Sequence, residues 1–255
     1  MDAKKKRKIL VVDDEINVCK SICQAIESEN YDVHMALSGE EALKKDKADP
    51  YDLIITDLMM PGISGMDLLT SLKTDRPGVP VIMITGYPNI KTAIQSIKTG
   101  AFDYLPKPFT PKDLRSLVAR AFKSSEPEGE TPSPPEMPEG LFAMKGHTWT
   151  RREGKNLATV GILPEFLRSM ASIAHIELQK KNKRIFQGEV CARITDAEGN
   201  IHRVWSPVTG TIAQQNTALQ KNLTVLKADP YGKGWILRIE ARDIDKDLER
   251  LSSST

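Results

Sequence analysis

The first 123 residues alternate between short apolar runs and longer mixed stretches, and this alternation constrains the fold more than any other feature. The apolar runs favour strands, and the stretches between them favour helices. Because short loops join five such units, we expect an α/β fold with a doubly wound, five-stranded parallel sheet and helices on both faces. The expected strands cover about 7–13, 31–35, 52–56, 80–85 and 102–105, and the expected helices about 15–28, 38–46, 64–74, 89–99 and 111–123.

Local signals mark three of the helix starts. Ser38 and Ser64 each stand just before an acidic residue of the next helix, which is typical of an N-cap. Thr110 precedes Pro111, and proline favours the first helical position. These positions support the helix boundaries given above.

A chain of 255 residues is long enough for two domains. Residues 124–140 are rich in Pro and Glu and cannot build a core, so we expect them to be extended. The sequence therefore predicts a first domain at 1–123, a linker at 124–140 and a second domain at 141–255.

The formal net charge of +2 hides an uneven distribution. Residues 124–140 hold five acidic residues and no basic one, whereas residues 141–255 hold 18 basic and 12 acidic residues, a surplus of six. That surplus is too weak to imply nucleic-acid binding by itself. No apolar run approaches the ~20 residues of a membrane helix, and no signal peptide precedes the first strand. We therefore expect a cytoplasmic protein.

After residue 141 the pattern changes to short strands with few helices, which predicts a small β-rich domain. A hairpin turn is expected at 197–200. Helices are expected at about 164–170 and 243–251. The expected strands cover 149–152, 157–161, 173–178, 185–186, 189–194, 201–205, 210–212 and 235–240.

Acidic residues stand where two strands of the first domain end. Asp57 closes the third strand, and Asp13 and Asp14 close the first. With the first strand central, these carboxylates are neighbours at the edge where parallel sheets bind ligands. They repel one another unless a cation lies among them, and oxygen ligands favour Mg²⁺. A single Asp at such a place could equally cap a loop, so the residues at the other strand ends decide between a loop cap and a functional carboxylate.

Two further strand ends carry polar groups. Thr85 closes the fourth strand, and Lys107 follows the fifth. Acids, a metal site, a hydroxyl and an ammonium at one edge suit a phosphoryl group, with a carboxylate as nucleophile. Taken singly, Thr85 could be a cap, Lys107 a surface lysine and Tyr104 a core aromatic. All of these strand ends together favour the phosphoryl site.

Residues 8–123 closely resemble the receiver domain of two-component response regulators. The matching positions are Asp13, Asp14, Asp57, Met59-Met60-Pro61-Gly62, Gly65, Thr85-Gly86, Tyr104 and Pro106-Lys107-Pro108. The resemblance implies a flavodoxin-like fold and a partner, a sensor histidine kinase, whose phosphohistidine supplies the phosphoryl group.

The resemblance also implies a role for each matching residue. Asp57 would accept the phosphoryl group, and Thr85 and Lys107 would hold its oxygens. Mg²⁺ would bind Asp14, Asp57 and the Met59 backbone carbonyl directly and Asp13 through water. Thr85 and an inward-turning Tyr104 would form the switch, and the Lys107–Pro108 bond would be cis.

The second half resembles the glycine-cleavage H protein, a lipoyl carrier, over about 142–251. This resemblance implies a barrel-sandwich hybrid of two small sheets. The matching positions are His147-Thr148-Trp149, Ala158-Thr159-Val160-Gly161-Ile162, Ser206-Pro207-Val208-Thr209-Gly210, Asn216 and Asp229-Pro230-Tyr231-Gly232-Lys233-Gly234-Trp235.

The lysine that carries lipoate in that family is missing. Its place falls near Gly199, and no lysine occurs between Arg184 and Gln220. A lipoyl amide needs an ε-amine, so neither Asn200 nor Arg193 could replace it. A fold without its site does not carry the function. We therefore expect no lipoate and read the domain as an interaction module.

Three functions are weighed on this basis. The first is a response regulator, not an enzyme beyond its own Mg²⁺-dependent phosphotransfer and dephosphorylation, that signals through a protein partner of its second domain. The second is a phosphorylation-controlled carrier using another lysine, such as Lys221 or Lys227. The third, with least support, is a DNA-binding regulator. A homodimer through the receiver is a further expectation.

Overall fold

The computed structural model describes residues 6–86, 90–125, 135–170 and 172–253. It divides into two compact units, Met1–Glu126 and Pro127–Thr255. The division falls inside the segment predicted as a linker, of which residues 126–134 lie outside the described part. Each unit has its own hydrophobic core and is described by itself.

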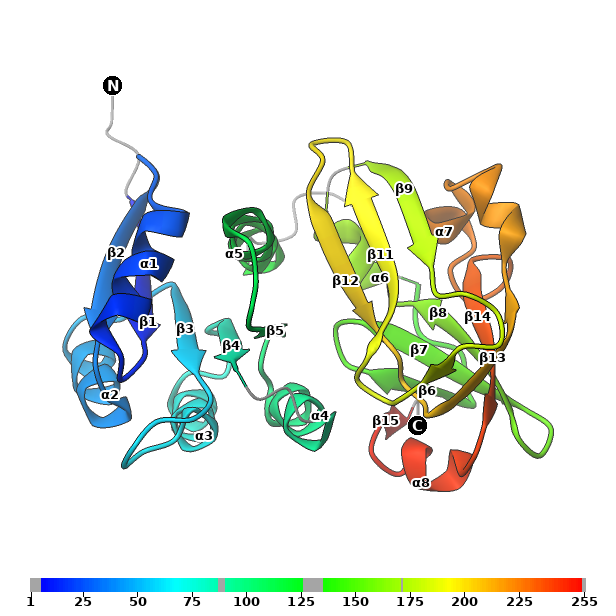
Figure 1. The fold of residues 1–255 in the computed structure, drawn as a ribbon, viewed down its shortest axis with the longest axis horizontal. Helices are drawn as coiled ribbons and strands as arrows, with labels where there is room; N and C mark the ends of the chain where they lie inside the picture. Colours follow the sequence, from blue (N-terminus) through cyan, green and yellow to red (C-terminus); the bar gives the residue numbers. More distant parts are fainter. Residues whose placement is uncertain (1–5, 87–89, 126–134, 171, 254–255) are drawn as a thin grey trace. The chain divides into compact units, whose positions relative to one another are not determined.

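The first unit contains a five-stranded, fully parallel sheet in the order β2-β1-β3-β4-β5 (Figure 1). The predicted strands are confirmed to within one residue at each end. The first strand lies inside the sheet between β2 and β3, as the neighbouring carboxylates of Asp13 and Asp57 required, and β3 is the middle strand of the five. The strands are β1 (Arg7–Val12), β2 (Tyr31–Ala36), β3 (Leu53–Asp57), β4 (Val81–Thr85) and β5 (Asp103–Pro106).

Helices cover both faces of this sheet, as predicted. Figure 1 shows α1 and α5 on one face and α2, α3 and α4 on the other. All residues of β3 and β4 are buried, because both faces are covered. The helices are α1 (Ile16–Ile26), α2 (Gly39–Ala48), α3 (Gly65–Asp75), α4 (Ile90–Thr99) and α5 (Pro111–Ser125).

The predicted N-caps are confirmed. The Ser38 hydroxyl accepts from the Glu41 N–H at 3.2 Å. Ser64 and Asp67 form a reciprocal capping box, and Thr110 and Asp113 exchange the same pair of bonds at 3.1 and 3.2 Å. Hence α2, α3 and α5 begin at positions that the sequence specifies locally.

The second unit is built from two antiparallel sheets, as expected for the barrel-sandwich hybrid. A seven-stranded sheet has the order β10-β13-β14-β8-β7-β6-β15, and a three-stranded sheet has the order β12-β11-β9. The strands are β6 (Leu141–Met144), β7 (Thr148–Glu153), β8 (Leu157–Ile162), β9 (Ile173–Leu178), β10 (Arg184–Ile185), β11 (Val190–Asp196), β12 (Ile201–Trp205), β13 (Gly210–Gln215), β14 (Trp235–Ala241) and β15 (Ser252–Ser253).

Short helical segments connect these strands. The two predicted helices are present but shorter, as α6 (Pro164–Arg168) and α8 (Ile244–Leu248). The 3₁₀ helix η1 (Thr217–Gln220) and α7 (Val225–Ala228) were not predicted, because four residues are too few to show a helical period. The strands β6 and β15, which pair with each other at the sheet edge, were also missed.

No helix in the described part of the chain is long and apolar enough to cross a membrane.

Candidate functional site

The functional side chains of the first unit stand at the carboxyl ends of its strands. Because all five strands are parallel, these ends lie along one edge of the sheet. Asp57 is the last residue of β3, and Asp13 follows β1, its direct neighbour. Thr85 ends β4 opposite Pro106 of β5, so the residue after Pro106, Lys107, reaches the same edge.

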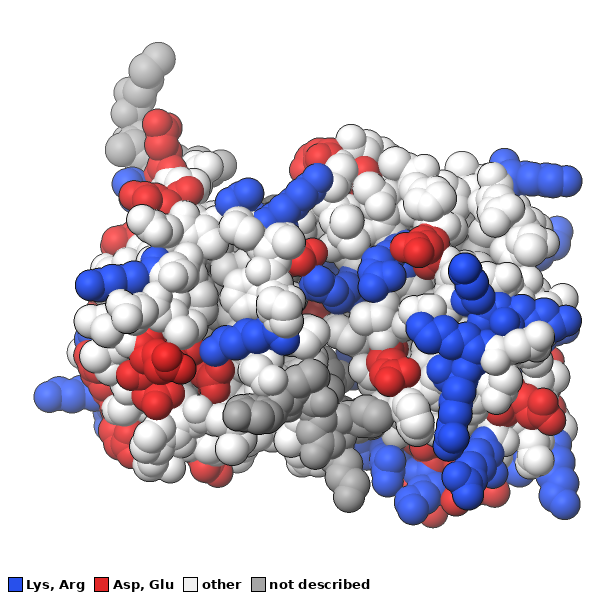
Figure 2. Space-filling model, in the orientation of Figure 1, with Lys and Arg blue, Asp and Glu red and all other residues white. Residues whose placement is uncertain are grey.

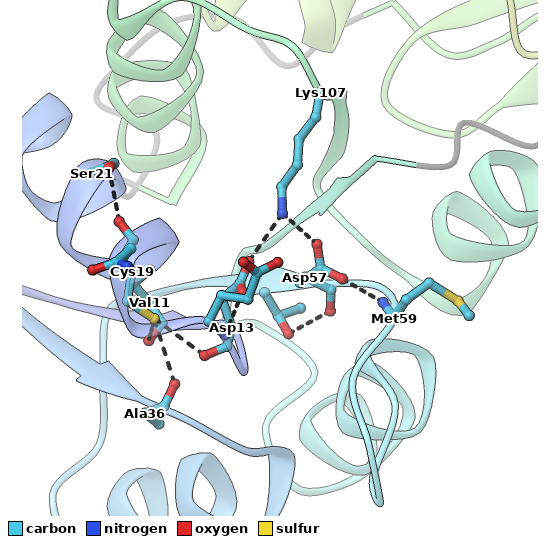
Figure 3. A network of polar contacts seen from close by, with 11 residues as sticks. Val11, Asp13, Cys19, Ser21, Ala36, Asp57, Met59 and Lys107 are labelled. Atoms are coloured by element: carbon cyan, nitrogen blue, oxygen red, sulfur yellow. Dashed lines mark hydrogen bonds and ion pairs between the residues drawn. The ribbon is translucent and has the colours of Figure 1, made fainter.

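Lys107 joins the two carboxylates. Its Nζ lies 2.8 Å from Asp57 Oδ1 and 3.1 Å from Asp13 Oδ2 (Figure 3). Both acids are buried, with Asp13 only 2% and Asp57 only 8% exposed. Burial disfavours the charged ammonium, but the hydrogen bonds to Asp57 and Asp13 outweigh it, so the pKa of Lys107 lies above its usual 10.5. The ammonium is therefore the counter-ion of the acidic pair.

Backbone amides fix both carboxylates from the other side. The Met59 N–H donates to Asp57 Oδ2 at 2.6 Å, and the Glu15 N–H donates to Asp13 Oδ1 at 2.9 Å. Asp57 is thus held by Lys107 on one oxygen and by the backbone on the other. A carboxylate held in this way keeps one orientation, which a nucleophile needs.

The switch residues of the sequence prediction are both buried. Thr85 is fully buried, and its carbonyl accepts from the Lys107 N–H at 2.8 Å. Tyr104 is 4% exposed, so its ring is turned inward, and burial raises its pKa to about 12. The predicted cis peptide bond between Lys107 and Pro108 is present.

The donors at this edge have the chemistry of a hard-cation site. Asp13, Asp14, Asp57 and the Met59 carbonyl offer only oxygen atoms, which Mg²⁺ prefers. Asp14 is exposed. The described residues contain no group of three His, Cys, Asp or Glu side chains placed to hold a metal ion. The set therefore fits Mg²⁺ by donor type, and the ligand assignment stays a prediction.

The hairpin turn between β11 and β12 occupies the predicted lipoyl position. Gly199 adopts φ +77°, and the residues from Val190 to Trp205 include no lysine. Lys221 and Lys227 are exposed, but one follows η1 and the other lies in α7, and neither stands on this hairpin.

A buried carboxylate locks that turn. Asp196, 3% exposed, accepts from the backbone N–H groups of Glu198 and Asn200 at 3.0 and 2.8 Å. Its other oxygen lies 2.9 Å from His202 Nε2. Burial opposes ionisation of Asp196, but these hydrogen bonds outweigh it, so its pKa lies below the usual 3.8. The turn keeps a defined shape without the family's lysine.

The sequence analysis did not find two buried polar pairs. One is Asp196 with His202, which meet across the two strands of the hairpin although His202 faces Ile194 in the strand register, so the predicted hairpin alone does not pair them. The other is Arg120 of α5 with Asp103 of β5, each 3% exposed. Neither Arg120 nor Asp103 belongs to a sequence motif, so only the structure, which brings the two side chains together, identifies this pair.

Comparison with known proteins assigns both units. Residues 9–119 match the response regulator receiver domain family, and residues 141–255 match the glycine cleavage H-protein family.

Curated relatives align with about half of this chain. The transcriptional regulatory protein ResD of Bacillus subtilis is 35% identical over 137 residues, which are 52% of this chain and 57% of ResD. The response regulator protein PilR of Pseudomonas aeruginosa is 38% identical over 125 residues, which are 49% of this chain and 28% of PilR. A solved receiver domain protein from Clostridium thermocellum is 38% identical, with a TM-score of 0.43, over 45% of this chain and 93% of that chain. The chain spans at most 57% of these two curated relatives.

Proposed function

We propose that this protein is a phosphorylation-controlled adaptor. Its residues 9–119 form a response regulator receiver domain, and its residues 141–255 form a glycine cleavage H-protein domain. A sensor histidine kinase donates the phosphoryl group, and the H-like domain passes the signal to a protein partner. The observation that most directly supports this proposal is the position of the Lys107 ammonium between two buried carboxylates, Asp57 and Asp13.

The transfer uses Asp57 as nucleophile. One carboxylate oxygen attacks the phosphorus of the kinase phosphohistidine, an O–P bond forms, and the P–N bond to the histidine breaks. The Met59 N–H and the Lys107 ammonium hold the carboxylate for this attack. Lys107 then neutralises one phosphoryl oxygen, and the Thr85 hydroxyl binds another.

Mg²⁺ would be held by Asp13, Asp14, Asp57 and the Met59 carbonyl. Bound there, it would supply positive charge to the transferring group. Chain residues supply the remaining work: Lys107 offsets the charge of Asp13 and Asp57, and the backbone orients them.

The output side of the proposal rests on the β11–β12 hairpin. Its turn is locked by Asp196 and carries no lysine, which favours recognition over group transfer. No DNA-binding role and no lipoate are proposed for this domain. We place the protein in the cytoplasm with its kinase partner, and we expect self-association to run through the receiver.

The first test measures phosphoryl transfer to Asp57. Wild-type protein incubated with Mg²⁺ and acetyl phosphate should gain one phosphoryl group in its intact mass, whereas Asp57→Asn should gain none. Asp75→Asn, which changes an exposed acid at the end of α3, is the matched control and should behave as wild type. Equal phosphorylation of wild type and Asp57→Asn would remove Asp57 from this role.

A carrier is the second candidate, favoured by the H-protein family match itself. Mass spectrometry of the protein isolated from its native host decides between the two. A lipoyl group on Lys221, Lys227 or any other lysine would overturn the adaptor.

A further inference from the structure

The turn between β9 and β10 concentrates positive charge on the second unit. Figure 2 shows blue side chains gathered over this segment. None of its cations forms an ion pair with an acidic residue of the described ranges, although Arg184 also lies over the Phe186 ring. We call this segment the basic turn; its exposed cations are Lys180, Lys181, Lys183 and Arg184.

The backbone holds the basic turn in one shape. The Lys183 N–H donates to the Lys180 carbonyl at 3.2 Å. Two further bonds attach the turn to β13: the Asn182 N–H donates to the Ile212 carbonyl at 2.8 Å, and the Ile212 N–H donates to the Lys183 carbonyl at 3.0 Å. Asn182 adopts φ +66°, a conformation that asparagine tolerates better than most residues. Because the backbone is already ordered, a ligand would not have to order it.

A small pocket lies next to the basic turn. Its volume is about 170 Å³. The Gln215 side chain on its wall donates to the Gln179 carbonyl at 3.0 Å, one residue before Lys180, which makes pocket and turn neighbours. Leu178 and Leu219 give the pocket apolar surface. Its lining includes His175, Glu177, Leu178, Gln215, Leu219 and Gln220.

We propose that the basic turn and this pocket together bind an acidic segment of a partner protein, with one apolar side chain of that segment in the pocket. This inference rests on the adaptor function, for which it names the chemistry of the partner. Uncompensated cations favour carboxylates by charge complementarity, and the apolar wall offers a place for a side chain.

A nucleic acid or a lipid surface fits these residues less well. The cations are confined to one turn, whereas a nucleic acid is held by basic groups spread along its backbone. Among the described residues that line the pocket there is no lysine or arginine, and Glu177 is paired with Arg193 at 3.6 Å, so a phosphate finds no counter-ion in the pocket. A leucine side chain needs no counter-ion.

The test measures binding of a fluorescein-labelled peptide, in which leucine alternates with glutamate pairs, to the full chain. We expect the peptide to bind at low salt and to be released as salt is raised. The double variant Lys180→Gln, Lys181→Gln should bind about tenfold more weakly. The matched control Lys145→Gln, Lys155→Gln loses the same charge from two other exposed loop positions and should bind as wild type. A peptide with serine for leucine should also bind about tenfold more weakly.

Three outcomes would overturn the proposal: no peptide binding, an equal loss in both double variants, or no effect of replacing leucine. Duplex DNA or anionic phosphatidylserine vesicles that bind more tightly than the peptide, and lose binding in Lys180→Gln, Lys181→Gln, would assign the turn to those ligands instead. Peptide binding by Asp57→Asn separates the two proposals: retained binding supports this site even where the receiver fails to be phosphorylated.

Discussion

At the scale of single residues, the receiver site depends on one positive charge that compensates two buried negative ones. Lys107 lies 2.8 and 3.1 Å from Asp57 and Asp13, and only 27% of its side chain is exposed. Removing the charge would leave two carboxylates facing each other with backbone amides as their main partners. Such a change raises the free energy of the folded, ionised state.

Lys107→Met should therefore lower the free energy of unfolding by about 1–2 kcal/mol at pH 7. The loss should shrink as the pH rises above 10.5 and through the higher pKa of Lys107, because the wild type then loses the same charge. Urea unfolding followed by circular dichroism at pH 7 and at a pH above that pKa measures this. Lys112→Met changes an exposed lysine in the first turn of α5 and should leave stability unchanged. An identical loss at both pH values would show that packing, not charge, is what Lys107 contributes.

At the scale of elements, the β11–β12 hairpin is stabilised by one ionised carboxylate. The pKa of Asp196 is depressed, so its contribution is present above its unfolded value of 3.8 and is lost as the pH falls through its lower folded value. Asp196→Asn should lower the free energy of unfolding of the second unit by about 1–3 kcal/mol at pH 6. Glu198→Gln, which changes an exposed residue of the same turn, should leave that free energy nearly unchanged. Thermal unfolding from pH 6 to pH 2.5 should show the unfolding midpoints of the two variants approaching each other as the pH falls. A constant difference between the midpoints would contradict the charge-based explanation.

How far the sequence could predict these elements depends on their length and on their partners. The strands of the receiver were predictable because β3 and β4 are buried apolar runs. Local cap signals at Ser38, Ser64 and Thr110 marked where three of the helices begin. In the second unit, η1 and α7 escaped because each has four residues. The hydrogen bond that locks the hairpin turn was not predicted, because Asp196 and His202 meet across two strands and no sequence pattern indicates that they pair.

At the scale of the whole molecule, the two units have separate cores, and all three tryptophans belong to the second unit. Trp149 and Trp205 are buried there, so tryptophan fluorescence reports the unfolding of the H-like unit alone. Circular dichroism in the helix region reports mainly the receiver, which holds the longer helices. The two signals can therefore separate the responses of the two units.

A ligand that binds only the folded receiver should stabilise only that unit. Beryllofluoride with Mg²⁺ at about 100 times its dissociation constant adds about 2.7 kcal/mol, which corresponds to a rise of roughly 10 °C in the receiver midpoint. The tryptophan transition should stay in place, and Asp57→Asn should abolish the shift in circular dichroism. Should the tryptophan midpoint rise together with that of the receiver, the units unfold as one, and the adaptor would act by changing the stability of its output domain instead of by changing the receiver surface.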